Sequence, residues 1–115
     1  MAEHELVKLF ENSPMRVFYD DVEEQWYLCI NDVIEVLTDS KDPAQYVKRM
    51  RMRDVELNSV WGTFCTTHQF ISSDGKKHAV QCASLKGVFR IIQSIPSKKA
   101  EPFKQWLASP LRTAV

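Results

Sequence analysis

The densest group of side chains able to do chemistry is a basic segment, KDPAQYVKRMRMR, at residues 41–53. Five of its thirteen positions carry a cation, although the chain as a whole has a formal net charge of zero. Cations at this density could neutralise several phosphates of a nucleic acid, and the affinity would then fall steeply with salt. A glutamine and an arginine on one face could also reach the edges of adenine and guanine. The candidate contacts are Lys41, Gln45, Lys48, Arg49, Arg51 and Arg53.

Two lysine pairs elsewhere in the sequence could supply further phosphate contacts. Lys76 and Lys77 follow an Asp-Gly turn, and Lys98 and Lys99 precede the last apolar segment. The competing interpretation of each pair is a solvated turn, and that of the basic segment is a solvated helix face.

The distribution of charge along the chain favours a polyanionic partner. Residues 1–40 contain two basic and ten acidic side chains, a net charge of −8, whereas residues 41–115 have a net charge of +8. A basic face attracts phosphates even in a neutral protein. The alternative is that the two halves neutralise each other in the fold.

Other kinds of chemistry find little support in the sequence. Its three histidines have no partner at metal-ligand spacing, no two cysteines form a C-x-x-C pair, and none of its three glycines belongs to a phosphate-binding loop. The three cysteines are too few and scattered for a disulfide framework, so we expect reduced, mostly buried thiols. We therefore expect no enzyme activity, no cofactor and no metal.

The length and hydropathy of the chain indicate one globular domain. At 115 residues it can bury a substantial core but is short of two ordinary domains. No apolar run approaches the roughly 20 residues of a membrane span, and the acidic start lacks the features of a secretory signal. These observations predict a cytoplasmic protein without membrane contact.

The first half of the sequence predicts a β-hairpin followed by two short helices. Residues 15–30 contain two arms rich in β-branched and aromatic residues, joined by the polar stretch DDVEEQ. Asn31 suits a helix N-cap, and Asp32 would then complement the helix dipole. Asp42 followed by Pro43 predicts a second helix start. A short helix, a turn and a second helix with a basic outer face have the outline of a helix-turn-helix unit.

The second half predicts another hairpin and two more helices. The arms THQFIS and KHAVQCAS flank the turn Asp74-Gly75, and VWGTFC before them could add a third strand. Ser84 suits an N-cap before a continuous apolar stripe at helical spacing. A last helix follows at KKAEPFKQWLAS, with Pro102 in or near its first turn. The predicted fold class is α+β: antiparallel β-hairpins or a sheet packed against about four short helices, including the helix-turn-helix-like pair.

Laid end to end, these segments resemble the Bro-N family, the amino-terminal domain of BRO proteins and of phage and prophage antirepressors. RVFYDDVEEQWYLCINDVIEVL is similar to the opening of the family, and DPAQYVKRM is similar to its second helix. The most recognisable part is SSDGKKHAVQCASLKGVFRIIQSIPSKKAEPFKQWL, which ends in the Ala-x-x-Phe-x-x-Trp pattern of Ala100, Phe103 and Trp106. Cys82-Ala83-Ser84 departs from the glutamate-containing pair that usually precedes the apolar helix.

The resemblance sets the expected domain boundaries: an N-terminal segment at 1–11, a Bro-N-like domain at 12–110 and a tail at 111–115. Full-length relatives generally carry a further C-terminal domain, so the sequence is either a short form or part of a longer protein.

The resemblance implies a DNA-binding domain of a phage or prophage regulator, antirepressor-like in some members. The expected partner is double-stranded DNA, bound with weak sequence specificity, and a homodimer is left open. The alternative is a protein-interaction module that inactivates a phage repressor without binding DNA, with residues 41–53 docking on an acidic surface.

Overall fold

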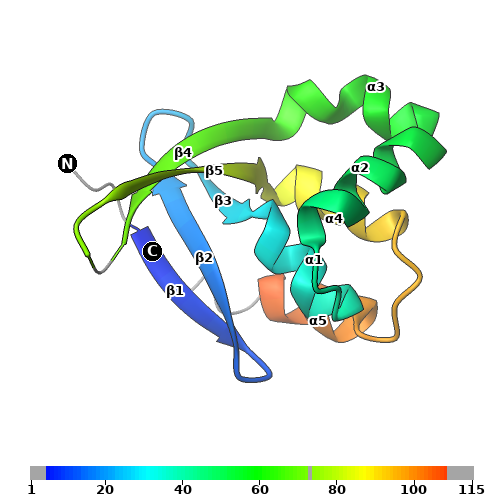
Figure 1. The fold of residues 1–115 in the computed structure, drawn as a ribbon, viewed down its shortest axis with the longest axis horizontal. Helices are drawn as coiled ribbons and strands as arrows, with labels where there is room; N and C mark the ends of the chain where they lie inside the picture. Colours follow the sequence, from blue (N-terminus) through cyan, green and yellow to red (C-terminus); the bar gives the residue numbers. More distant parts are fainter. Residues whose placement is uncertain (1–4, 73, 109–115) are drawn as a thin grey trace.

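The chain folds around one antiparallel sheet whose five strands lie in the order β1-β2-β3-β5-β4 (Figure 1). The computed structural model describes residues 5–72 and 74–108. The strands are β1 (Glu5–Phe10), β2 (Ser13–Asp20), β3 (Gln25–Cys29), β4 (Cys65–Ile71) and β5 (Lys77–Ser84). The helices of this described part are α1 (Ile30–Thr38), α2 (Pro43–Arg53), α3 (Val55–Phe64), α4 (Leu85–Gln93) and α5 (Ala100–Ala108). The expected α+β class is confirmed, with five helices where about four were predicted.

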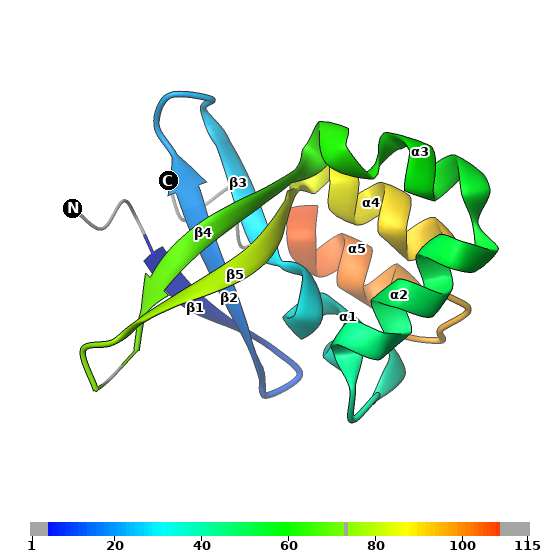
Figure 2. The same ribbon diagram turned by 45° about the horizontal axis from the view of Figure 1, so that its top comes forward.

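The helices gather at one end of the molecule and the strand hairpins extend from the other (Figures 1 and 2). Alternation along the strands divides the buried side chains between two clusters, as the period of two requires. In β2, Val17 belongs to the main core between the sheet and the helices, whereas the adjacent Phe18 belongs to a smaller cluster with Tyr27, Phe70 and Cys82. The main core also contains Met50 of α2 and Phe103 of α5, so it fixes both helices against the sheet.

The sheet is strongly curled, and the β4–β5 hairpin crosses over β1 and β2 (Figures 1 and 2). The two edge strands consequently meet. His68 of β4 stacks on Phe18 with 3.9 Å between ring centroids, and its Nε2 lies 2.7 Å from the Oε2 atom of Glu5 in β1. His68 packs against Phe18 and Phe70 and so covers one side of the smaller apolar cluster.

Strand β1 occupies the segment expected to precede the domain. Its hairpin with β2 turns at Glu11 and Asn12, which both have positive φ, of 51° and 68°. Two such residues in a two-residue turn match the twist of the flanking strands. Asn tolerates this conformation, but Glu does not favour it. The sequence Glu-Asn is therefore not the Asn-Gly or Asp-Gly pair that would have indicated a turn here. The expected boundary at residue 12 therefore falls within a hairpin, and the tail expected at 111–115 lies outside the described residues.

Helix α3 replaces the third strand predicted at VWGTFC, and that prediction was wrong. Residues 55–64 are helical, and β4 begins only at Cys65. Asp54 caps the helix by accepting a hydrogen bond from the backbone N–H of Leu57 at 3.0 Å. Leu57 and Trp61, one turn apart, are both buried in the main core. The cap and this buried pair outweigh the β-like composition of the segment.

The helix starts show which capping predictions hold. Asp42 accepts from the backbone N–H of Gln45, with Pro43 in the first turn, and Ser84 accepts from that of Gly87, so both predicted caps are confirmed. The predicted cap at Asn31 was wrong, because α1 begins at Ile30 and its N-cap residue, Cys29, makes no side-chain cap. Asp32 does lie in the first turn of α1, as predicted, and its carboxylate also binds Arg16.

The close approach of α3 and α4 depends on Gly87. A Cβ at this position would lie 2.7 Å from the Cβ of Phe64 and 2.3 Å from its ring. Gly87→Ala should therefore lower the free energy of unfolding by about 2 kcal/mol, although alanine normally stabilises a helix relative to glycine. Urea denaturation measures the change. Gly62→Ala in α3, where a Cβ meets nothing within 4 Å, is the matched control, and equal stabilities of the two variants would contradict the prediction.

Candidate nucleic-acid interface

Helix α2 presents the basic segment to solvent. Val47 and Met50 are buried in the main core, and Tyr46 packs against it, so one side of α2 is fixed against α1 and α3. The other side carries the polar residues, as the helical period requires. Lys41, Gln45, Lys48, Arg49 and Arg53 are exposed and Arg51 is partly buried.

The cations of α2 are not neutralised by the acidic first third of the chain. In the part of the chain that the structure describes, no ion pair involves Lys41 or the four basic residues of α2. Carboxylates of the first forty residues pair elsewhere, Asp32 with Arg16, Glu5 with His68 and Asp39 with Lys99. The charge of α2 is therefore available to an external anion.

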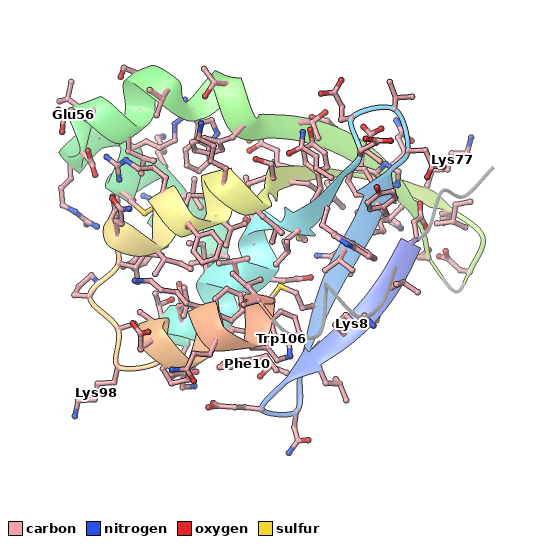
Figure 3. All side chains as sticks on the ribbon, turned by 180° about the vertical axis from the view of Figure 1, so that it is seen from behind. Lys8, Phe10, Glu56, Lys77, Lys98 and Trp106 are labelled. Atoms are coloured by element: carbon pink, nitrogen blue, oxygen red, sulfur yellow. The ribbon has the colours of Figure 1, made fainter. Side chains whose placement is uncertain are left out.

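The acidic residue at the end of α2 is also engaged by side chains other than the cations of α2. Asp54 ends α2 and begins α3, and it lies within hydrogen-bond distance of Ser94 and of Arg90 in α4. The hydrogen bond from Ser94 has the largest effect on the pKa of Asp54, and that from the Leu57 N–H comes next. Both hold this pKa below its usual value. Glu56, in the first turn of α3, projects outward from the end of the helix layer (Figure 3). The one-residue junction at Asp54 fixes α2 relative to α3 and α4.

A groove of about 600 Å³ lies beside α2, between that helix and strand β5. One wall carries Lys48 and Arg51 of α2 with Asn58 of α3, and the opposite wall includes Gln81 of β5. Asn31 of α1 also lines the groove. The groove thus combines two cations of α2 with three side-chain amides, each of which can donate hydrogen bonds.

The basic face of α2 is divided by this groove into two rows. Lys48 and Arg51, three residues apart, line the groove. At about 100° per residue, Gln45, Arg49 and Arg53 lie on the other side of the exposed face, and of these Gln45 and Arg49 face solvent. The terminal nitrogen NH2 of Arg53 donates to the carbonyl of Ser94 at 3.1 Å, which docks this arginine against the end of α4.

Arg51 is oriented by two neighbours from α3. Its Nε donates to Oδ1 of Asn58 at 2.8 Å, and its guanidinium lies 4.8 Å from the centroid of a Trp61 ring. Its terminal nitrogens have no protein partner among the described residues. Arg51 therefore offers an oriented fork of free donors, the geometry that suits a phosphate.

Arg16 also lines the groove, but its charge is satisfied within the protein. Its Nε and a terminal nitrogen donate to the two carboxylate oxygens of Asp32 at 2.9 and 3.0 Å, and Asp32 also accepts from the Arg16 backbone N–H. The hydrogen bond to Asp32 raises the pKa of Arg16 above its ordinary value. This pair supports the floor of the groove.

The other predicted contacts are far from α2. Lys76 and Lys77 are exposed at the tip of the β4–β5 hairpin, at the opposite end of the molecule from the helices (Figures 1 and 3). The longest extent of the structure is 38 Å, close to one turn of duplex DNA at about 34–36 Å. Lys98 lies exposed before α5, while Nζ of Lys99 is 3.7 Å from Asp39. The structure does not gather these lysines into one site with α2.

Other chemistry is sparse in the described residues. They contain no group of three or more histidine, cysteine or acidic side chains that could hold a metal ion. The thiols of Cys29 and Cys82 are buried, and burial raises the pKa of Cys29 to about 11 and that of Cys82 further. None of the helices described is both long and apolar enough to cross a membrane.

Fold and site together define a small α+β domain that presents a basic helix on a rigid scaffold. The family model of the BRO family, N-terminal domain, matches residues 14–113, and the chain belongs to this Bro-N family. The family is associated with phage and prophage BRO proteins and DNA-binding regulators. No curated protein and no solved structure matches the chain.

The basic helix was predictable from the sequence, but the groove beside it was not. Asn31, Asn58 and Gln81 are isolated polar residues in three elements, and nothing in their local sequence indicates a shared site. Only the pairing of β5 with β3 and the α2–α3 corner bring them to one place.

Proposed function

We propose that this domain binds double-stranded DNA without catalysis, as part of a phage- or prophage-type regulator acting in the cytoplasm. The observation that carries the proposal is the basic face of α2. The five cations of residues 41–53 have no carboxylate partner in the described part of the chain. An α-helix is about 10–12 Å across, which suits the major groove of about 12 Å. Membership of the Bro-N family supports the same partner.

The proposed contacts are mostly with phosphates and so give weak sequence specificity. Lys48, Arg49 and Arg51, with Lys41 before the helix, would neutralise phosphates on either side of the inserted α2. Gln45 is exposed and lies between Lys48 and Arg49 around the helix, so it is the candidate for contact with a base edge. Lys76 and Lys77 would reach the backbone about one helical turn away.

A salt titration tests the proposal. Each phosphate neutralised should contribute about −0.9 to the slope of log K against log salt, so the five cations of residues 41–53 permit a slope as steep as about −4.5. Fluorescence anisotropy with a labelled 20-base-pair duplex measures the slope between about 50 and 200 mM salt. An affinity that does not change with salt, or no binding at the lowest salt, would exclude DNA binding through α2.

A second candidate function, antirepression through protein contact, is supported by the β2–β3 turn. Val22 is 87% exposed within the sequence DDVEE, and its turn is ordered by Asp20, whose Oδ1 accepts from the backbone N–H groups of Val22 and Glu23. An exposed apolar side chain among carboxylates suits a partner surface that is basic and has an apolar recess. A pull-down of a purified phage repressor that survives moderate salt and needs no DNA would favour this function. Size-exclusion chromatography would show whether the domain forms a homodimer.

A further inference from the structure

We infer that the groove between α2 and β5 is a binding site for the sugar–phosphate backbone of one DNA strand. The inference rests on the proposed function and assigns the surface that flanks the inserted helix. It adds Asn31, Asn58 and Gln81, on both walls of the groove, to the proposed contacts of α2.

The size of the groove limits what can occupy it. At about 600 Å³ it lies within the range of about 300–1,000 Å³ typical of small-ligand pockets, so a whole duplex cannot enter. A single backbone ridge can. When a helix occupies the major groove, the two backbones that bound the groove lie along its flanks. The cavity beside α2 lies where one of these backbones would run.

The chemistry of the two walls matches a phosphodiester. Lys48 and Arg51 provide positive charge on the helix wall, and the amides of Asn58, Asn31 and Gln81 can donate to phosphate oxygens from both sides. No acidic side chain is among the described residues that line the groove, and Asp32, which binds the lining residue Arg16, is paired with its guanidinium. A polyanion would meet donors on each side and no exposed anion.

The preorganisation of Arg51 gives this site its anchor. Asn58 and Trp61 already hold the guanidinium in place, so little side-chain freedom is lost when a phosphate binds to its free terminal nitrogens. Asn58 acts here as a positioning residue. The outward-facing arginine, Arg49, has no such support in the described structure.

Two isosteric substitutions test the site from opposite walls. Asn58→Asp turns the Arg51 hydrogen bond into an ion pair, so duplex affinity should fall about tenfold at 50 mM salt and the salt slope should become shallower by about one. Gln81→Glu, on β5, places a carboxylate where the backbone would lie and should weaken binding about fivefold. Both residues are exposed, so folding should be retained, and thermal denaturation verifies this.

The control is Gln105→Glu on the exposed face of α5, which makes the same change of charge outside the groove. It should alter affinity for the same labelled 20-base-pair duplex less than twofold. If Asn58→Asp and Gln81→Glu bind as Gln105→Glu does while substitutions on the outer face of α2 abolish binding, the groove inference is overturned and the proposed function stands. If the wild-type chain does not bind the duplex at low salt, both are overturned.

Discussion

Replacing Lys48 and Arg49 together by glutamate should weaken duplex binding about 100-fold at 50 mM salt. By the counterion-release relation, each phosphate contact contributes about tenfold to affinity at this salt concentration, and the double variant loses two. The two side chains point to different flanks of α2, Lys48 into the groove and Arg49 away from it. Their joint loss therefore removes contacts to both backbones. Fluorescence anisotropy across the salt series should also show the slope become shallower by about two.

The matched control is Lys86→Glu with Lys104→Glu, which changes the net charge by the same amount on α4 and α5. This variant should retain most of the affinity, because Lys86 and Lys104 lie outside the proposed contact. Salt screens exposed charges that are further apart than the Debye length, which is about 10 Å at 0.1 M. If the two double variants lose affinity equally, net charge and not α2 governs binding, and the assignment of the helix fails.

Asp32→Asn should lower the free energy of unfolding by about 2–3 kcal/mol. The carboxylate is 12% exposed and accepts three hydrogen bonds from Arg16, so its neutral analogue leaves a guanidinium without its counter-ion. Breaking a fully buried pair costs about 3–5 kcal/mol, and the 40% exposure of Arg16 reduces that figure. Urea denaturation followed by circular dichroism measures the loss.

Asp39→Asn is the control for this stability effect. Asp39 is 81% exposed and its ion pair with Lys99 spans 3.7 Å, so the change should stay within about 0.5 kcal/mol. The double variant Asp32→Asn with Arg16→Met should regain part of the stability, because no unpaired charge remains. Equal unfolding midpoints for Asp32→Asn and the wild type would show that the pair does not support the fold.

Local chemistry in the sequence was enough to predict α2 and its orientation. The Asp42-Pro43 start and the spacing of Val47 and Met50 determine where the helix begins and which side it buries, and the structure has both. The second hairpin and the cap at Ser84 were predictable for the same reason, since each depends on a few adjacent residues.

Features that depend on distant residues could not be predicted. VWGTFC has the composition of a strand, but α3 is stabilised by the cap at Asp54 and by burial of Trp61 in a core built from the whole chain. Asp32 was expected to serve the dipole of its own helix, and its contact with Arg16 became visible only once β2 was placed beside β3. The groove could not be predicted for the same reason, because its lining comes from α1, α2, α3, β2 and β5, and all of these elements must be in place to form it.

The acidic β2–β3 turn and the basic helix α2 lie at different ends of the molecule, the turn among the strands and α2 among the other helices (Figure 1). A neutral particle with separated poles experiences a torque in the field of a polyelectrolyte, although it gains little from net attraction. In the proposed binding of DNA, the domain would rotate before contact and arrive with α2 leading. Orientation on approach, more than the rate of encounter, is then what the uneven placement of charge provides.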